Sequence, residues 1–104
     1  MKVTGTQLGL LRRLELDSVR TAVRFAGGFW IASGDSALWR VWMQRPWHER
    51  GRPPVQYWGA NTITALEKRG LLGPVERPAV YNTPRELTRL ALLWLHNRGA
   101  EDFR

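Results

Sequence analysis

The chain has 104 residues, a formal net charge of +7 and no cysteine. That length holds one domain with one modest core, and a hydrophobic fraction of 43% argues against a disordered chain. The lack of cysteine excludes disulfides, thiolate nucleophiles and cysteine-ligated zinc. No apolar run follows Lys2, and the longest one, Leu90 to Leu95, is far shorter than the roughly 20 residues that cross a membrane. We therefore expect one cytoplasmic globular domain over residues 1–104.

The positive charge comes mainly from arginine, since Lys2 and Lys68 are the only lysines among the 16 basic residues. A small basic domain binds polyanions because phosphate contacts release counterions. The guanidinium fork also fits phosphates and guanine edges. A GC-rich genome enriches arginine without a functional cause, and acidic proteins also attract basic surfaces. Charge therefore leaves both nucleic acids and acidic proteins open as partners.

The first predicted element is a helix from about residue 5 to residue 15. Thr4 and Gln7 have the spacing of a capping box, in which each side chain bonds the backbone N–H of the other residue. Helical periodicity places Gln7, Leu11 and Leu14 on the inward stripe. Arg13 is expected to point away from the core.

A β-hairpin is predicted next. Alternating side chains indicate a strand that ends near Phe25, and residues 29–33 form the return strand. Gly27 and Gly28 between them are typical of a two-residue turn, because its central residues need positive φ. This turn would pair Trp30 with Phe25 on a buried face.

Residues 37–44 fit either a helix or a strand. Leu38, Val41 and Trp42 have the spacing of one helix face, whereas alternation would place Trp39 beside Val41 on one strand face. Because tryptophan and valine favour strands, we prefer the strand.

Residues 45–56 contain three prolines and predict a loop. Three arginines lie in it, Arg45, Arg50 and Arg52, and we expect them to flank a nucleic-acid-binding helix and to contact phosphates. Trp47 stands among these arginines. It either stacks on a base or fills a partner's pocket, or it folds back to cover the core.

A short helix with a defined stop follows at residues 61–69. Asn61 or Thr62 is a good N-cap for it. Ile63 and Leu66 lie three positions apart and face one way, and Gly70 fits the left-handed conformation just past a helix end.

The opposite face of that helix is small and polar, with one cation. Its members are Asn61, Thr64, Ala65 and Lys68. Such a face permits close approach to a DNA groove. An ordinary surface helix has the same geometry, so the periodicity alone leaves both interpretations open.

The helix at 61–69 resembles the recognition helix of winged helix-turn-helix DNA-binding domains, whose typical run is Thr-Val-x-x-Leu-x-x-Arg-Gly-Leu-Leu/Ile. The matching residues are Thr62, Ile63, Leu66, Arg69, Gly70, Leu71 and Leu72. Residues 81–86 are similar to the Tyr-x-Leu-Thr-x-x-Gly start of the last helix in these domains. They have Asn82 where leucine is usual and Glu86 where glycine is usual. The resemblance covers roughly residues 58–90, and residues 30–58 do not match the compact second helix of the family.

The resemblance implies an α+β, winged-helix-like fold: an N-terminal helix, a β-hairpin, a recognition-like helix, a short wing and a C-terminal helix. It implies a DNA-binding protein of bacterial or phage type that regulates transcription or a mobile element. Together with the basic loops, it gives these expected contacts to duplex DNA: Asn61, Thr62, Thr64, Lys68, Arg69, Arg45, Arg50, Arg52 and Arg77. The alternative is a non-enzymatic protein-binding module or phage-type inhibitor that occupies a nucleic-acid-binding protein complex.

The wing is expected between Gly73 and Tyr81, with Arg77 near its tip. Residues 83–86 have the spacing of a second capping box, so the last helix is expected to start there and to run to about Asn97.

The last helix is apolar on more than one side. Its expected core stripe is Leu87, Leu90, Ala91 and Trp94. Three further leucines, Leu92, Leu93 and Leu95, lie outside this stripe. Because a helix that is apolar on most sides usually buries a second face, we expect these three residues to form a homodimer interface.

No catalytic or metal-binding pattern is present in the sequence. His48 and His96 lie on different predicted elements, and neither has a carboxylate at a spacing that suggests a catalytic dyad. Two histidines without cysteine make no zinc signature. We therefore expect no cofactor, no metal and no enzymatic activity.

Overall fold

The computed structural model describes residues 2–25 and 27–101 of the chain. The described residues form an α+β fold with four α-helices and a four-stranded antiparallel sheet. In chain order the elements are α1 (Gly5–Leu16), β1 (Thr21–Arg24), β2 (Trp30–Ala32), α2 (Ser36–Gln44), α3 (Ala60–Lys68), β3 (Leu72–Pro74), β4 (Arg85–Leu87) and α4 (Arg89–Glu101). Single 3-10 turns lie on either side of α2, at Ser33–Asp35 and Trp47–Glu49. The predicted α+β class is confirmed.

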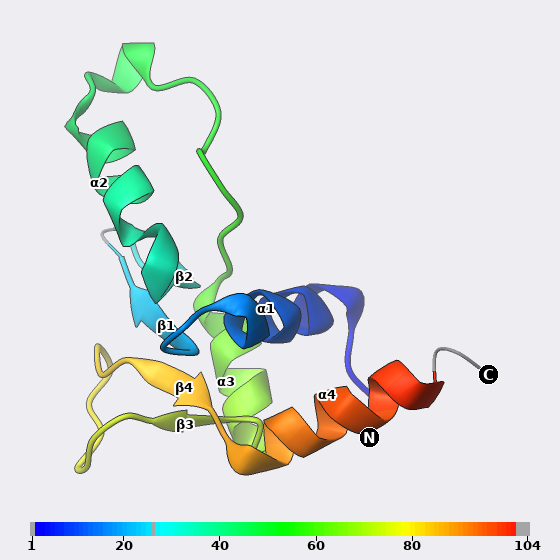
Figure 1. Cartoon of the computed structure of the whole chain (residues 1–104). Coiled ribbons are helices and arrows are strands. Elements are labelled where there is room, and N and C mark those ends of the chain that lie inside the picture. The colour runs from blue at the N-terminus through cyan, green and yellow to red at the C-terminus, as the bar shows by residue number, and fades with distance from the viewer. Residues whose placement is uncertain (1, 26, 102–104) are drawn as a thin grey trace.

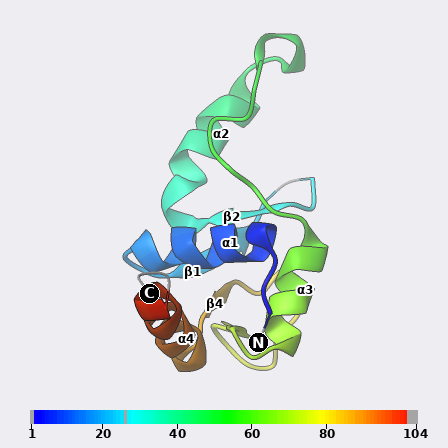
Figure 2. The same ribbon diagram turned by 90° about the vertical axis from the view of Figure 1, so that its right-hand side faces the viewer.

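The main core lies between the sheet and three helices, α1, α3 and α4 (Figure 1). The strands are ordered β2-β1-β4-β3. In Figure 2, helix α1 runs across the view, and α3 and α4 lie below it near its opposite ends. The aliphatic members of this core that exceed alanine in size are Leu10, Leu11, Leu14, Ile63, Leu66, Leu71, Leu72, Leu87 and Leu95. We call this part of the molecule the body.

Helix α1 confirms the predicted capping box. The Gln7 amide N–H donates to Thr4 Oγ1 at 3.2 Å, and the Thr4 N–H donates to Gln7 Oε1 at 3.3 Å. The inward stripe differs slightly from the prediction, because Leu10 is fully buried with Leu11 and Leu14, whereas Gln7 is half-buried. Burial of each leucine contributes about 1.5–3 kcal/mol.

The hairpin of β1 and β2 forms, but its register differs from the prediction by one residue. Arg24 is the partner of Trp30, and Phe25 donates its N–H to the carbonyl of Phe29 at 2.7 Å. The predicted pairing of Trp30 with Phe25 is therefore wrong, because the loop has three residues instead of two. Gly28 has φ +87°, so the expected positive φ is present although the loop is one residue longer. A one-residue slip exchanges the faces of a strand, so Phe25 points away from the main core.

Residues 36–44 form helix α2, so the preferred strand is wrong. Trp39 is 1% exposed, and its ring meets that of Trp42 edge-on at 5.3 Å, one helical turn away. The packing of these rings overrides the weak strand preference of tryptophan and valine. Asp35 stands at the N-cap without a capping hydrogen bond from its side chain.

Helix α2 and the loop of residues 45–57 project from the body, and we call this part the arm (Figures 1 and 2). A cluster of aromatic rings, 4.8–6.3 Å apart, supports it. The members of the cluster are Phe25, Phe29, Trp39, Trp42 and Tyr57. The chain re-enters the body where Trp30 and Trp58 exchange two backbone hydrogen bonds, at 2.7 and 2.9 Å.

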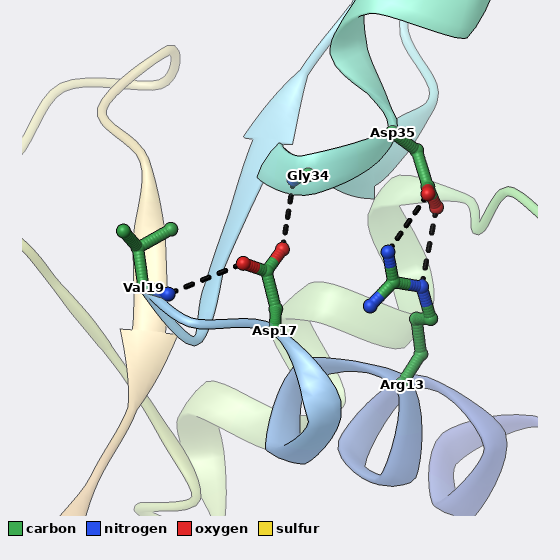
Figure 3. Close-up of polar contacts among 5 residues, drawn as sticks. All are labelled: Arg13, Asp17, Val19, Gly34 and Asp35. Carbon is green, nitrogen blue, oxygen red and sulfur yellow. Dashed lines mark hydrogen bonds and ion pairs between the residues drawn. The ribbon is translucent and has the colours of Figure 1, made fainter.

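Two carboxylates join the arm to α1 (Figure 3). Asp17 accepts the Gly34 N–H at 2.8 Å and the Val19 N–H at 3.2 Å. Asp35 accepts two hydrogen bonds from the Arg13 guanidinium, at 2.7 and 3.3 Å. The hydrogen bond to Asp35 raises the pKa of Arg13. Burial lowers this pKa by a smaller amount, and the Coulomb attraction of the two carboxylates raises it. Arg13 therefore lies outside the core, as predicted, and binds the segment that leads into the arm.

The return strand of the wing and the start of the last helix lie further along the chain than predicted. Strand β3 pairs with β4 at residues 85–87, so the predicted return strand ending at Tyr81 and the predicted helix start at 83–86 are both wrong. Helix α4 begins at Arg89, where Thr88 Oγ1 accepts the Ala91 N–H at 3.1 Å. Leu87 is buried in the sheet, and this burial favours a strand over another helical turn.

The predicted core stripe of the last helix is confirmed at Leu87, Ala91 and Trp94 and is wrong at Leu90. Ala91 and Leu95 are buried, whereas Leu90 and Leu93 are 49% and 53% exposed. Leu92 is half-buried and packs against the core. Leu95 is therefore a core residue instead of an interface residue, because it lies one turn after the buried Ala91 on the same face of α4.

Candidate nucleic-acid interface

Helix α3 begins one residue before the expected start. Gly59 is its N-cap, and Asn61 lies inside the first turn, so the predicted capping by Asn61 or Thr62 is wrong. The predicted stop is confirmed. Gly70 has φ +75°, and its N–H donates to the Glu67 carbonyl at 2.9 Å. The Leu71 N–H reaches back to the Leu66 carbonyl at 3.0 Å, which completes a Schellman motif.

The two faces of α3 are as the sequence predicts. Ile63 and Leu66 are 2% and 0% exposed and anchor the helix in the core. The outward side chains of the predicted contact set are exposed together: Asn61, Thr64, Lys68 and Arg69. Thr62 is half-buried at the edge of this face. The structure thus presents a row of small polar side chains that ends in two cations.

The carboxylate of α3 is paired with an arginine of strand β4. Glu67 Oε1 lies 3.0 Å from Nε of Arg85, which is 8% exposed. The distance is that of an ion pair, although Arg85 Nε has no aligned hydrogen bond. Pairing with Arg85 neutralises the acidic residue of α3, which would otherwise repel a phosphate backbone. Periodicity could not reveal this pair, because 18 positions separate its members in the sequence.

Arg85 also holds the wing loop, residues 75–84, beside α3. Its guanidinium donates to the carbonyl of Thr83 and, at 3.4 Å, to that of Val80. It lies 5.8 Å from the centroid of the Trp30 ring. A single buried arginine therefore contacts the recognition-like helix, the wing loop and the core.

A second arginine holds the same loop from strand β1. The Arg24 guanidinium lies 4.6 Å from the ring centroid of Tyr81 and donates to Asn82 Oδ1 at 3.1 Å. Tyr81 and Thr64 both line a recess of about 80 Å³ between the loop and α3. Arg77 is exposed in this loop. The loop that lies beside α3 therefore carries the predicted wing cation as an exposed residue.

The arginines of the arm do not lie beside α3 or the wing loop. Residues 45–52 follow the far end of α2, away from α3 and the wing (Figures 1 and 2). The prediction that Arg45, Arg50 and Arg52 flank the recognition-like helix is wrong, because α2 extends the loop away from the body. Arg50 is also engaged internally: it donates to the carbonyl of Met43 at 2.7 Å and to that of Arg45 at 2.9 Å.

Neither a metal site nor a membrane helix is present among the described residues. No group of three or more histidine, cysteine, aspartate and glutamate side chains in the described part of the chain is close enough to hold a metal ion. None of the described helices is long and apolar enough to cross a membrane. His48 is exposed beside Glu49, with 3.8 Å between the imidazole Nε2 and the carboxylate.

Comparisons of the chain with models of protein families, with curated proteins and with solved structures found no match.

Proposed function

We propose that the protein binds duplex DNA through the exposed face of α3 and the adjoining wing loop. The observation that carries this proposal is the exposed row of Asn61, Thr64 and Lys68 on a helix whose acidic residue, Glu67, is paired with a buried arginine. A major groove admits an α-helix whose outward side chains are short and polar.

The order of elements supports a winged-helix-like assignment. An N-terminal helix, a strand, the recognition-like helix and a two-stranded wing follow one another, and β1 pairs with β4 of the wing. Strand β2 and the arm are additions to that order. Residues 45–59 connect α2 to α3, a far longer link than the three- or four-residue turn of a helix-turn-helix unit.

Each part of the surface has a role in the proposed complex. Asn61 and Thr64, on the N-terminal half of α3, lie near base edges, and their amide and hydroxyl groups donate and accept hydrogen bonds. Lys68 and Arg69 reach phosphates at the edge of the groove, and Arg77 reaches the backbone from the wing loop. A regulator of transcription or of a mobile element needs such a combination of positioning and reading contacts.

The test separates reading contacts from phosphate contacts. Sequences selected from a random duplex library on the wild-type protein serve as probes for Asn61→Ala, Thr64→Ala and Lys68→Ala. Removal of a base-reading side chain costs about 1–3 kcal/mol and relaxes the selected sequence, whereas Lys68→Ala weakens all duplexes alike and lowers the salt slope by about one unit. If all three variants kept the wild-type affinity and slope, α3 would not be the reading helix.

Pairing of two copies through α4 is part of the same proposal. Of the three predicted interface leucines, Leu93 is exposed, and Leu90 lies beside it one turn earlier. We propose this pair as the contact of a two-fold dimer that binds paired half-sites. Leu93→Glu is then expected to give a folded monomer in sedimentation. A wild-type chain that sediments as a monomer at high concentration excludes the dimer.

A further inference from the structure

The arm presents an apolar helix face that the fold leaves open. On α2, Trp39 is 1% exposed and packs into the aromatic cluster, so one side of the helix is covered. Leu38 and Val41 on another side are 53% and 56% exposed. A helix with two apolar sides normally buries both of them. Uncovered apolar surface with a polar rim is typical of an interaction site.

Two apolar hollows lie on either side of Trp42. One, of about 200 Å³, is lined by Phe29, Trp39, Trp42, Pro53 and Tyr57. The other, also about 200 Å³, is lined by Leu38, Val41, Trp42, Arg45 and Pro54. Each is smaller than the roughly 300–1,000 Å³ of a pocket for a drug-sized ligand. Their size suits single apolar side chains that a peptide presents one after the other.

The charge around these hollows is one-sided. Residues 36–58 contain four arginines against the single carboxylate of Glu49. Arg40, Arg45 and Arg52 are exposed, and Arg45 itself lines one hollow. Asp35, just before α2, is paired with Arg13. An occupant with apolar side chains and neighbouring carboxylates therefore complements this surface.

Two of the aromatic rings that line the hollows, those of Trp39 and Trp42, do not offer the open faces on which bases stack. Trp39 is buried, and the Arg50 guanidinium lies 5.3 Å from the centroid of the Trp42 ring. The Trp42 indole N–H is also used, since it donates to the Arg50 carbonyl at 2.9 Å. Aliphatic side chains, Leu38 and Val41, complete the surface. Apolar side chains of a protein fit such a surface better than nucleobases, which need exposed aromatic faces.

We propose that the arm docks an acidic amphipathic segment of a partner protein. Two apolar side chains of the segment enter the hollows beside Trp42, and its carboxylates lie near Arg40, Arg45 and Arg52. This is the mode in which an amphipathic helix lays its apolar side into a groove. The site is at the opposite end of the molecule from α3 and the wing, so it does not depend on the DNA proposal (Figure 1).

The experiment uses peptides from a phage-displayed random library, selected on the full-length protein. The recovered peptides are synthesised with a fluorescent label, and their affinities are measured by anisotropy. The expected peptides are acidic and carry two apolar residues at helical spacing. Val41→Ser and Arg45→Glu each weaken binding about tenfold or more. The matched control is Val19→Ser, because Val19 in the body is also 56% exposed, and it leaves binding unchanged.

Several results would overturn the proposal. Failure to enrich any peptide, recovery of peptides that are not acidic, or equal binding to wild type and Val41→Ser would each remove the arm as the docking site. A labelled single-stranded oligonucleotide is measured in parallel. If Val41→Ser and Arg45→Glu weakened the oligonucleotide but not the peptides, the arm would be a nucleic-acid surface. Self-association of wild type that Val41→Ser abolished would identify a second copy as the occupant.

Discussion

The body and the arm are built from different side chains, and each presents a different kind of surface. In the body, leucine and isoleucine from three helices and a sheet make most of the core, which also contains Trp30 and Trp58, and α3 exposes polar residues. In the arm, one short helix and a proline-containing loop close around aromatic rings, and α2 exposes Leu38 and Val41. The comparison shows that a short chain can separate a polar, cationic surface from an apolar one by placing them at opposite ends.

A substitution in the core of the body is expected to destabilise the protein most. Leu66→Ala removes a side chain that is 0% exposed and leaves a cavity beside α1, which lowers the free energy of unfolding by about 2–5 kcal/mol. Urea denaturation measures this change. The control is Val41→Ala on the open face of the arm, where a change below about 0.5 kcal/mol is expected. Equal destabilisation of the two variants would remove the distinction between a packed body and an open arm face.

The junction between the two regions is expected to show the next largest effect. Asp17→Ala leaves the N–H groups of Gly34 and Val19 without their carboxylate partner and lowers the free energy of unfolding by about 1–3 kcal/mol. Near-UV circular dichroism reports whether the tryptophans of the arm lose their fixed surroundings. Asp17→Asn keeps one acceptor oxygen and is expected to be less destabilising. If Asp17→Ala kept the near-UV spectrum and the free energy of unfolding of the wild type, the arm would be positioned without this contact.

A smaller effect is expected at the end of α3, where the left-handed backbone of Gly70 stops the helix. Gly70→Ala places a Cβ at φ +75° and costs about 1–2 kcal/mol. Gly5→Ala is the control, because Gly5 lies in the first turn of α1, has ordinary φ and has open space around it. Thermal unfolding of the two variants gives the comparison. A Gly70→Ala protein as stable as Gly5→Ala would contradict the described helix stop.

The smallest effect on stability is expected at the tip of the arm. Trp47 is 81% exposed, so the sequence-based alternative that it folds back over the core is wrong. Trp47→Phe is expected to change the free energy of unfolding by less than about 0.5 kcal/mol. It should nevertheless remove much of the tryptophan fluorescence that acrylamide quenches. Quenching that stays at the wild-type level would place Trp47 in contact with other parts of the protein.

Local signals allowed prediction of most of the body, because they depend on neighbours in the sequence. The capping box at Thr4, the inward pair Ile63 and Leu66 and the stop at Gly70 each follow from spacing within a few residues. The start of α4 was missed because Thr83 and Glu86 imitate a capping box, whereas Leu87 belongs to the sheet and Thr88 caps the helix. Only the pairing of β4 with β3 shows that the helix starts after Thr88 and not after Thr83.

Long-range contacts account for the rest of the differences. The helical state of 36–44 depends on the rings of Phe25, Phe29 and Tyr57, which come from both sides of α2 in the sequence. The pairing of Glu67 with Arg85 and the anchoring of Gly34 by Asp17 likewise join distant segments. Sequence patterns identified α3 as a candidate site. They did not show that α2 carries the following loop away from the body, so its arginines were predicted to flank α3.

Two triple variants with the same change in net charge test the proposal that the body, and not the arm, binds duplex DNA. One replaces Lys68, Arg69 and Arg77 with glutamine, and the other replaces Arg40, Arg45 and Arg52. Binding of labelled duplex DNA is measured by anisotropy over a series of salt concentrations. The body variant is expected to lower the slope of log affinity against log salt by about 0.9 for each phosphate that the protein no longer neutralises, whereas the arm variant keeps the wild-type slope. A reduced slope for the arm variant together with a wild-type slope for the body variant would contradict the claim.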